Sequence, residues 1–202
     1  MTNVLAIYRR ELRAYFDGPL AYIIVPIFLG LVGVFCLYFQ DVFEAGIADM
    51  RRGFFWMALF YLLLIPALTM KSFAEEMRTG SLEMLVTLPV SEEQMVLGKY
   101  FASLSLVVFT LVLSFSYPFS LSQIGDLDWG PVIGGYLGLA LLGAAFCAIG
   151  IAMSSITNSQ VVAFLLSFTV GVLPFAMGYA LGTVPPSWLP VIQYMTFEYH
   201  FS

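Results

Sequence analysis

The sequence predicts an all-α, polytopic membrane protein. Three observations carry this prediction. Of 202 residues, 60% are hydrophobic and only 10% are charged, and the mean hydropathy is +0.92, whereas a soluble domain carries about 25% charged residues. Long stretches hold no charged side chain, above all residues 129–197. The charges that remain are concentrated in short segments between these stretches. At this length we expect a single domain, residues 1–202.

Four charge-free stretches are long enough to cross a bilayer, and the last of them is long enough to cross it twice. The first has 23 residues, and about 20 helical residues span the hydrocarbon core. The 129–197 stretch is interrupted by polar residues at 154–160 and by Gly and Pro at 182–187, so it divides into two spans. Helices are expected because a helix satisfies its own backbone groups in lipid. The five predicted spans are 18–40, 53–70, 100–125, 131–153 and 161–181.

The distribution of Lys and Arg predicts which way the spans face. Six of the eight cationic residues fall in segments on one side of the membrane and two, Arg51 and Arg52, on the other. Because cytoplasmic loops carry the excess of Lys and Arg, we expect a cytoplasmic N-terminus. Residues 9, 78 and 158 should then be cytoplasmic, and residues 44, 126 and 187 should lie outside. The six cytoplasmic cations are Arg9, Arg10, Arg13, Lys71, Arg78 and Lys99.

Residues 3–17 predict an amphipathic helix that lies on the membrane surface. One face of this helix is aromatic and apolar, and another carries three arginines that can meet anionic headgroups. The alternative is that the segment is simply the flank of the first span. The apolar face consists of Tyr8, Leu12, Tyr15 and Phe16, and the cationic face consists of Arg9, Arg10 and Arg13.

Residues 72–90 form a charged segment between the second and third spans. Ser72 and Glu75 fit a capping box, and Gly80 is expected to end a helix in the left-handed conformation. A second short helix should follow from Ser81 to Leu88, with Leu82, Leu85 and Val86 on one face, and Pro89 should end it. A further capping box, Ser91 to Gln94, should begin the third span. The alternative is an ordinary solvated loop; the helical pattern favours a docking segment for a soluble partner.

Small residues recur in the fourth span and predict close helix packing there. Gly134 and Gly138 are in GxxxG register, and Gly143 continues the ridge. Such ridges let helix backbones approach closely. We expect them to pack within one protomer, with a dimer seam as the alternative.

Several classes of function are excluded by what the chain lacks. No predicted span carries an Asp, Glu, Lys, Arg or His, which argues against a proton relay or a fixed ion site. His200 is the single histidine, so we expect no metal site, and we expect no catalytic residue. Gly98 and Lys99 do not form a phosphate-binding loop, because the upstream Gly is absent. The net charge of −5 argues against a nucleic-acid partner. Energised work would need an energy source on another chain.

The charged segment resembles a known family. Residues 69–90 (TMKSFAEEMRTGSLEMLVTLPV) and 96–100 (VLGKY) are similar to the cytoplasmic segment of type-2 ATP-binding-cassette (ABC) permeases. Residues 8–15 (YRRELRAY) and 128–138 (DWGPVIGGYLG) resemble in particular the permeases of gliding motility and multicopper-enzyme maturation. The resemblance implies a dimer of six-span subunits, so that a sixth helix would follow Ser202. It implies that 72–90 contains the coupling helix. The coupling residues would be Phe73, Glu75, Glu76, Arg78, Gly80, Ser81, Leu82, Glu83 and Leu85.

The resemblance also implies the function and partners of the chain. We expect the permease subunit of an ATP-driven exporter in the bacterial inner membrane, docked on cytoplasmic ABC ATPase subunits and paired with a second permease subunit. ATP and Mg would bind to the ATPase, and this chain would bind no cofactor. The uncharged spans suit an apolar, amphiphilic or polymeric substrate. Two alternatives stay open: a force-transmitting complex that acts on a periplasmic auxiliary protein, and a non-transporting membrane scaffold.

Overall fold

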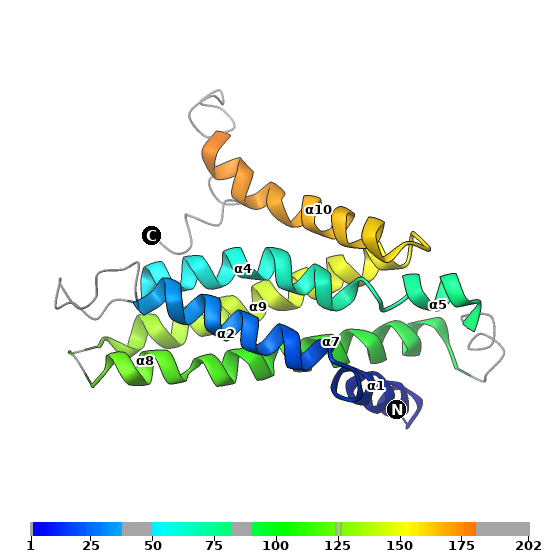
Figure 1. The fold of residues 1–202 in the computed structure, drawn as a ribbon, viewed down its shortest axis with the longest axis horizontal. Coiled ribbons are helices and arrows are strands. Elements are labelled where there is room, and N and C mark those ends of the chain that lie inside the picture. The colour runs from blue at the N-terminus through cyan, green and yellow to red at the C-terminus, as the bar shows by residue number, and fades with distance from the viewer. Residues whose placement is uncertain (1, 38–49, 82–89, 124, 126, 181–202) are drawn as a thin grey trace.

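The computed structural model describes residues 2–37, 50–81, 90–123, 125 and 127–180. All regular secondary structure in these residues is helical, which confirms the all-α class. The helices are α1 (Thr2–Asp17), α2 (Leu20–Leu37), α4 (Arg51–Thr69), α5 (Ala74–Thr79), α7 (Glu92–Ser114), α8 (Ser116–Leu121), α9 (Trp129–Ser154) and α10 (Gln160–Ala180), and Figure 1 shows their arrangement.

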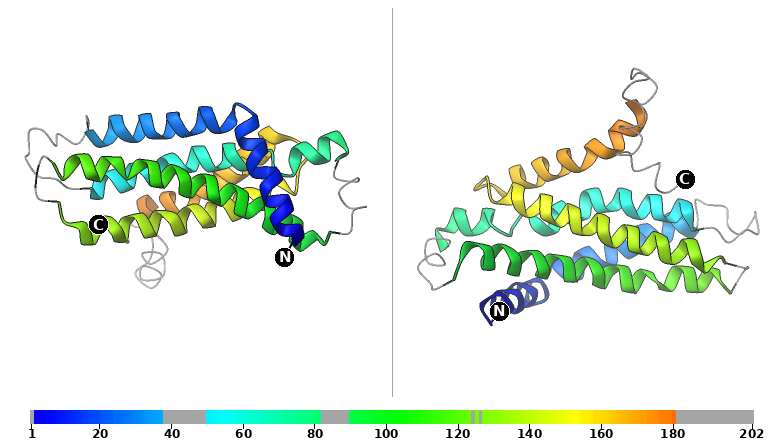
Figure 2. Two further views of the ribbon diagram at one scale, coloured as in Figure 1. Left: turned by 90° about the horizontal axis from the view of Figure 1, so that it is seen from below. Right: turned by 180° about the vertical axis from the view of Figure 1, so that it is seen from behind.

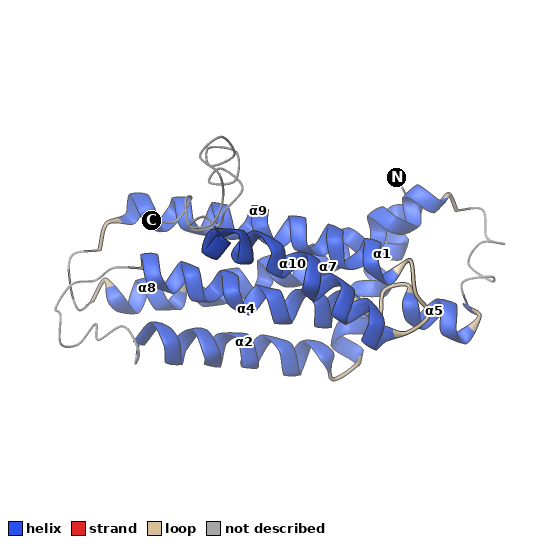
Figure 3. Cartoon of the chain, turned by 90° about the horizontal axis from the view of Figure 1, so that it is seen from above, coloured by secondary structure: helices blue, strands red, loops and turns tan. Residues whose placement is uncertain are grey.

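Four long helices form the body of the molecule. Helices α2, α4, α7 and α9 run along one long axis, α8 continues α7 after a break, and α10 leans away from α4 and α9 (Figures 1 and 3). The core lies between the four helices and is almost entirely apolar, since these helices have apolar residues on every side. Its fully buried members include Phe28 of α2, Tyr61 and Ile65 of α4, Leu106 of α7 and Leu139 of α9.

Three helical stretches among the described residues are long and apolar enough to cross a membrane. They are Gly53–Thr79, Glu92–Leu121 and Trp129–Ser154. A fourth is obtained if Asn3–Asp17 and Leu20–Phe35, which meet at a bend of 72°, count as one span. In α10, the part whose side chains are described, Gln160–Ala176, is apolar but shorter than these three stretches. The chain is therefore a helical, polytopic protein, but the structure supports three or four spans where the sequence predicts five.

Helix α1 crosses the start of α7, and the chain then turns sharply into α2 (Figure 2). Ile7 is buried against Gly98, where a Cβ atom would come within 2.7 Å of Ile7 Cγ2. The hydroxyls of Tyr8 and Tyr15 hydrogen-bond to serine Oγ atoms of α7 at 3.1 and 2.9 Å. Much of the face that the sequence predicts to lie on lipid thus packs on α7 instead, although Phe16 stays exposed.

Helix α9 packs through a set of glycines that shares Gly143 with the predicted ridge but not Gly134. A Cβ atom at Gly135 would overlap Phe54 of α4, and one at Gly143 would lie 2.8 Å from Val107 Cγ1 of α7. Gly150 faces Thr69 of α4 in the same way. Gly134 is exposed, with no atom of the described chain within 4 Å of its added Cβ, and Gly138 is half-buried. Close packing within the chain therefore uses the face one residue away from Gly134.

Charged residues gather at one end of the bundle, which we call the charged end. It comprises α1, α5, the first turns of α7 and the last turn of α9 (Figures 1 and 2). The opposite end holds α8 and the start of α9. The charged residues of the charged end are Arg9, Arg10, Glu11, Arg13, Asp17, Lys71, Glu75, Glu76, Arg78, Glu92, Glu93 and Lys99.

Candidate functional site

The short helix α5 projects at the charged end, directly after α4. A turn at residues 70–73 separates the two helices, and α5 runs from Ala74 to Thr79. Gly80 ends it with φ 73° and ψ 1°, as the sequence predicts. This left-handed conformation is open to Gly at little cost because Gly has no Cβ. Gly80 therefore gives α5 a well-defined end.

The N-terminus of α5 is capped by a residue from another helix. The sequence predicts Ser72 as the cap, but Phe73 occupies the cap position and makes no side-chain cap hydrogen bond. Instead, Ser154 Oγ at the end of α9 accepts from Phe73 N at 3.0 Å and from Ala74 N at 3.1 Å, and donates to Met70 O at 3.0 Å. A hydroxyl offers one donor and two acceptor sites, so Ser154 is fully used. It fastens the end of α9 to the start of α5.

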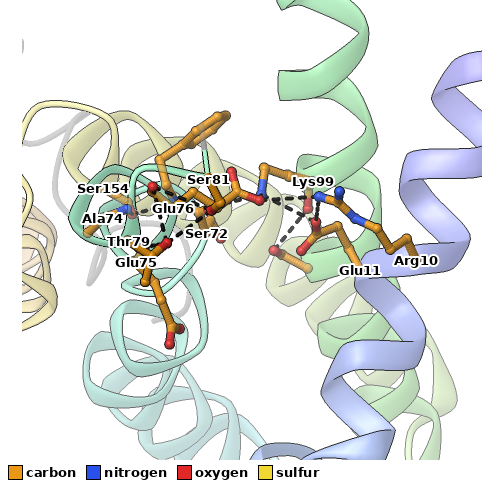
Figure 4. A network of polar contacts seen from close by, with 12 residues as sticks. Arg10, Glu11, Ser72, Ala74, Glu75, Glu76, Thr79, Ser81, Lys99 and Ser154 are labelled. Atoms are coloured by element: carbon orange, nitrogen blue, oxygen red, sulfur yellow. Dashed lines mark hydrogen bonds and ion pairs between the residues drawn. The ribbon is translucent and has the colours of Figure 1, made fainter. Parts of the chain in front are cut away.

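Lys99 is the centre of the charged end. It lies in the second turn of α7 with only 2% of its side chain exposed. Its Nζ donates to Ser72 O at 2.6 Å, Glu76 Oε1 at 2.8 Å and Glu11 Oε1 at 3.3 Å (Figure 4). An ammonium has three donors, and all three have an acceptor. The Phe73 ring, whose centroid is 4.9 Å from Nζ, adds a cation–π contact.

Arg10 makes this cluster electrically balanced. Its Nη2 lies 2.6 Å from Glu11 Oε1 and 3.2 Å from Glu76 Oε1. Burial lowers the pKa of Arg10, but hydrogen bonds and charge from Glu11 and Glu76 outweigh that effect and raise it. Two cations thus share two carboxylates, which offsets the desolvation cost that a single buried charge would carry. The four residues connect α1, α5 and α7.

Tyr15 extends the contact between α1 and α7 beside this cluster. Burial raises its pKa to about 12, a rise that the hydrogen bond with Ser103 opposes. The phenol is therefore neutral at physiological pH and free to share its hydrogen with Ser103. Asn3 contributes a further link from the far end of α1, donating from Nδ2 to Gln94 Oε1 at 3.3 Å.

The arrangement is that of a helical bundle with a small helix fastened to one end. A comparison with known families shows which family the chain belongs to. Residues 39–195 match the family described as ABC-2 family transporter protein. This chain belongs to the ABC-2 transporter family. A search of the curated proteins finds no match. ABC-2 proteins are the membrane components of ABC transporters and are not themselves catalytic, so the chain is a multi-pass membrane protein that works with an ATPase partner in a lipid bilayer.

The predicted coupling residues of this ABC-2 chain divide into two groups. Phe73 and Glu76 point into the Lys99 cluster, so Glu76 is used inside the chain and is not a free docking group. Arg78 and Gly80 are exposed, and Glu75 and Ser81 are half-buried. Leu82, Glu83 and Leu85 lie outside the described residues.

The predicted cationic residues of the N-terminal helix also divide into two groups. Arg9 and Arg13 are exposed and line a shallow depression with Asp17. Arg10 turns toward α5 and pairs with carboxylates. Only part of the predicted cationic face is thus left to meet headgroups.

Sequence reasoning assigned no role in the site to Lys99, Ser154 and Glu11. Lys99 carries a signal that could have been used: it is the last cation before a long apolar span, where a buried charge needs a partner. Ser154 gave no such signal, because its cap acts across 80 residues of sequence. Within the part of the chain that the structure describes, no group of His, Cys, Asp and Glu could hold a metal ion.

Proposed function

We propose that this ABC-2 chain is the permease subunit of an ATP-driven exporter, and that α5 with the residues up to 90 is the segment that docks on the ATPase. The observation that carries the proposal is the fastening of α5 at the charged end by Lys99 and Ser154. A segment through which force enters a bundle must be tied to more than one of its helices. Here one six-residue helix is tied to α1, α7 and α9.

The charged end is proposed to face the cytoplasm of a bacterium, with the chain in the inner membrane. Six of the eight Lys and Arg residues support this orientation, because cytoplasmic segments carry the positive excess. ATP and Mg then bind to the partner ATPase. When the ATPases close, α5 moves and its ties pass the movement to α7 and α9. The uncharged spans favour an apolar or amphiphilic substrate over a small ion.

The resemblance of residues 69–90 supports two further parts of the proposal. A second permease subunit, identical or related, completes the path between two protomers. We further propose membership of the gliding-motility and multicopper-enzyme-maturation subgroup, which residues 8–15 and 128–138 resemble. A periplasmic auxiliary protein is a further expected partner. The exposed Arg78 is the described side chain that offers charge-assisted hydrogen bonds to the ATPase.

The test is co-purification of the ATPase with the subunit, followed by ATP turnover in reconstituted membranes. Gly80→Val forces a β-branched residue into the left-handed region, which costs about 1–2 kcal/mol, and should weaken ATPase docking about tenfold. No atom of the described chain lies within 4 Å of a Cβ at Gly80, so the effect is one of backbone conformation. Gly80→Asn is the matched control, because Asn tolerates this conformation.

Charge at the docking surface is tested separately. Arg78→Ala removes the exposed charge of α5 and leaves the Lys99 cluster intact, so the variant should insert normally and bind the ATPase less tightly. An unaltered ATPase affinity and turnover in both this variant and Gly80→Val would show that the segment is an ordinary loop.

A further inference from the structure

A cavity opens where α1 bends into α2, beside α5. Its volume is about 420 Å³, within the range of small-molecule sites. The bend itself, from Ala14 to Leu20, forms the apolar part of its wall. The polar part of the wall carries three cations and three carboxylates, Arg10, Lys71 and Lys99 against Glu11, Glu75 and Glu76.

The ion pairs of the charged end leave one charge of each sign without a partner in this wall. Arg10 and Lys99 are neutralised by Glu11 and Glu76. The side chains of Lys71 and Glu75 make no ion pair or hydrogen bond with other residues in the described part of the chain. Glu76 Oε2 is buried and likewise has no hydrogen-bond partner there. The wall therefore offers one cation, one carboxylate and one further buried acceptor.

We propose that this cavity binds the headgroup of a zwitterionic phospholipid that carries a primary amine, of the phosphoethanolamine type. The Lys71 ammonium pairs with the phosphate. The Glu75 carboxylate accepts from the lipid ammonium, which has three donors. An anionic headgroup such as phosphoglycerol would pair its phosphate with Lys71 but would bring no cation to Glu75. A choline headgroup has the right charges but no N–H to donate.

The surroundings of the cavity fit a lipid better than a soluble zwitterion. Leu20 lines the cavity, and Ile23, Ile27 and Val34 follow it at i+3, i+7 and i+14, which places all four on one face of α2. Ile23, Ile27 and Val34 are 53%, 48% and 52% exposed. This apolar stripe starts at the cavity and runs along a membrane helix, so an acyl chain can lie on it while the headgroup occupies the cavity. Charged α1 meets apolar α2 at this point, which is the depth at which headgroups lie.

Lipid retention by the intact subunit tests the proposal and does not require the ATPase, so its outcome is independent of the proposed export function. The purified, delipidated subunit is given phosphatidylethanolamine, phosphatidylcholine or phosphatidylglycerol of matched chains, and bound lipid is measured by native mass spectrometry. Phosphatidylethanolamine should be retained about tenfold more tightly than either competitor, the factor that corresponds to one lost charge-assisted contact. Soluble phosphoethanolamine, which lacks the chains, should compete weakly.

Variants assign the effect to this cavity. Lys71→Gln and Glu75→Gln should each lower phosphatidylethanolamine retention about tenfold, and Glu75→Lys should reverse the preference toward phosphatidylglycerol. Arg13→Gln is the matched control, because Arg13 is an exposed cation of α1 outside the cavity wall, and its retention should equal that of the wild type. Equal retention of the three lipids by the wild type would overturn the proposal. So would an equal loss in Arg13→Gln and Glu75→Gln, or full displacement by soluble phosphoethanolamine.

Discussion

The Lys99 side chain is only 2% exposed, and its positive charge is stabilised by oxygen atoms from three segments. Removing such a charge leaves its partners behind. In Lys99→Met, Arg10 alone would have to balance the carboxylates of Glu11 and Glu76. Breaking a buried pair costs about 3–5 kcal/mol, and the lower value applies because the carboxylates are 17% exposed. We expect a loss of about 3 kcal/mol, measured by chemical unfolding in detergent micelles.

The matched control is Lys71→Met, since Lys71 is an exposed lysine of the same region. Its cost should stay within about 0.5 kcal/mol. Adding Glu76→Leu to Lys99→Met should recover part of the loss, because replacing both partners by apolar residues is often neutral. Equal losses for the two lysine variants would mean that the cluster adds no stability.

Ser154 stabilises the start of α5 through hydrogen bonds to its backbone, whereas Lys99 acts through ion pairs. Ser154→Ala removes the acceptor for the amides of Phe73 and Ala74, and a lost N-cap costs about 1 kcal/mol. Amide hydrogen exchange at residues 73–79 should therefore accelerate about fivefold, with little change in the rest of α9. Ser155→Ala removes the neighbouring hydroxyl, which among the described residues bonds to Ala152 O of its own helix. Exchange in α5 should not change in this variant. A similar acceleration in both variants would contradict the assigned cap.

At the scale of elements, the glycines of α9 provide a comparison between adjacent positions. Gly135→Ala forces a methyl group into Phe54, and overpacking of this kind costs about 1–3 kcal/mol. Gly134→Ala adds the same methyl where no described atom lies within 4 Å, so it should be neutral, or stabilising by up to about 1 kcal/mol as the better helix former. Thermal unfolding of the two variants in micelles measures the difference. If Gly134→Ala were the more damaging change, Gly134 would have to face a partner subunit. The assignment of Gly135 to the close-packed face of α9 would then be wrong.

The same comparison shows what the sequence can predict about an element. A ridge of small residues in α9 was predictable, but its direction was not, because a helix that is apolar all round gives no signal of which face meets α4. Helix α1 shows the same limit. Its amphipathic pattern predicts a helix, yet Tyr8 and Tyr15 suit a membrane interface as well as the serines of α7. The end of α5 at Gly80 was predictable because that signal is local.

Across the whole molecule, hydropathy predicted the helical class and the gathering of charges at one end. Both depend on composition along the chain. The count of spans was less accessible, because it depends on how a bend is treated. Helices α1 and α2 meet at 72°, and they give a further span only if they count as one. The cluster of Lys99 with Glu11 and Glu76 was inaccessible for a different reason: it joins residues 88 and 23 positions apart.

The charged end should face the cytoplasm, and cysteine labelling can test this for the whole bundle. In a background with Cys36→Ser and Cys147→Ala, single cysteines are introduced by Arg78→Cys, Asn158→Cys and Asp128→Cys. Residue 78 lies in α5, and residue 158 lies between α9 and α10, so both are at the charged end. Residue 128 precedes α9 at the opposite end. Since six of the eight cations mark the charged end, a membrane-impermeant maleimide should label intact cells at 128 only. Label at 78 and 158 should appear after permeabilisation. Label at 78 without label at 128 would invert the orientation, whereas label at both 128 and 158 would show that α9 does not cross the membrane.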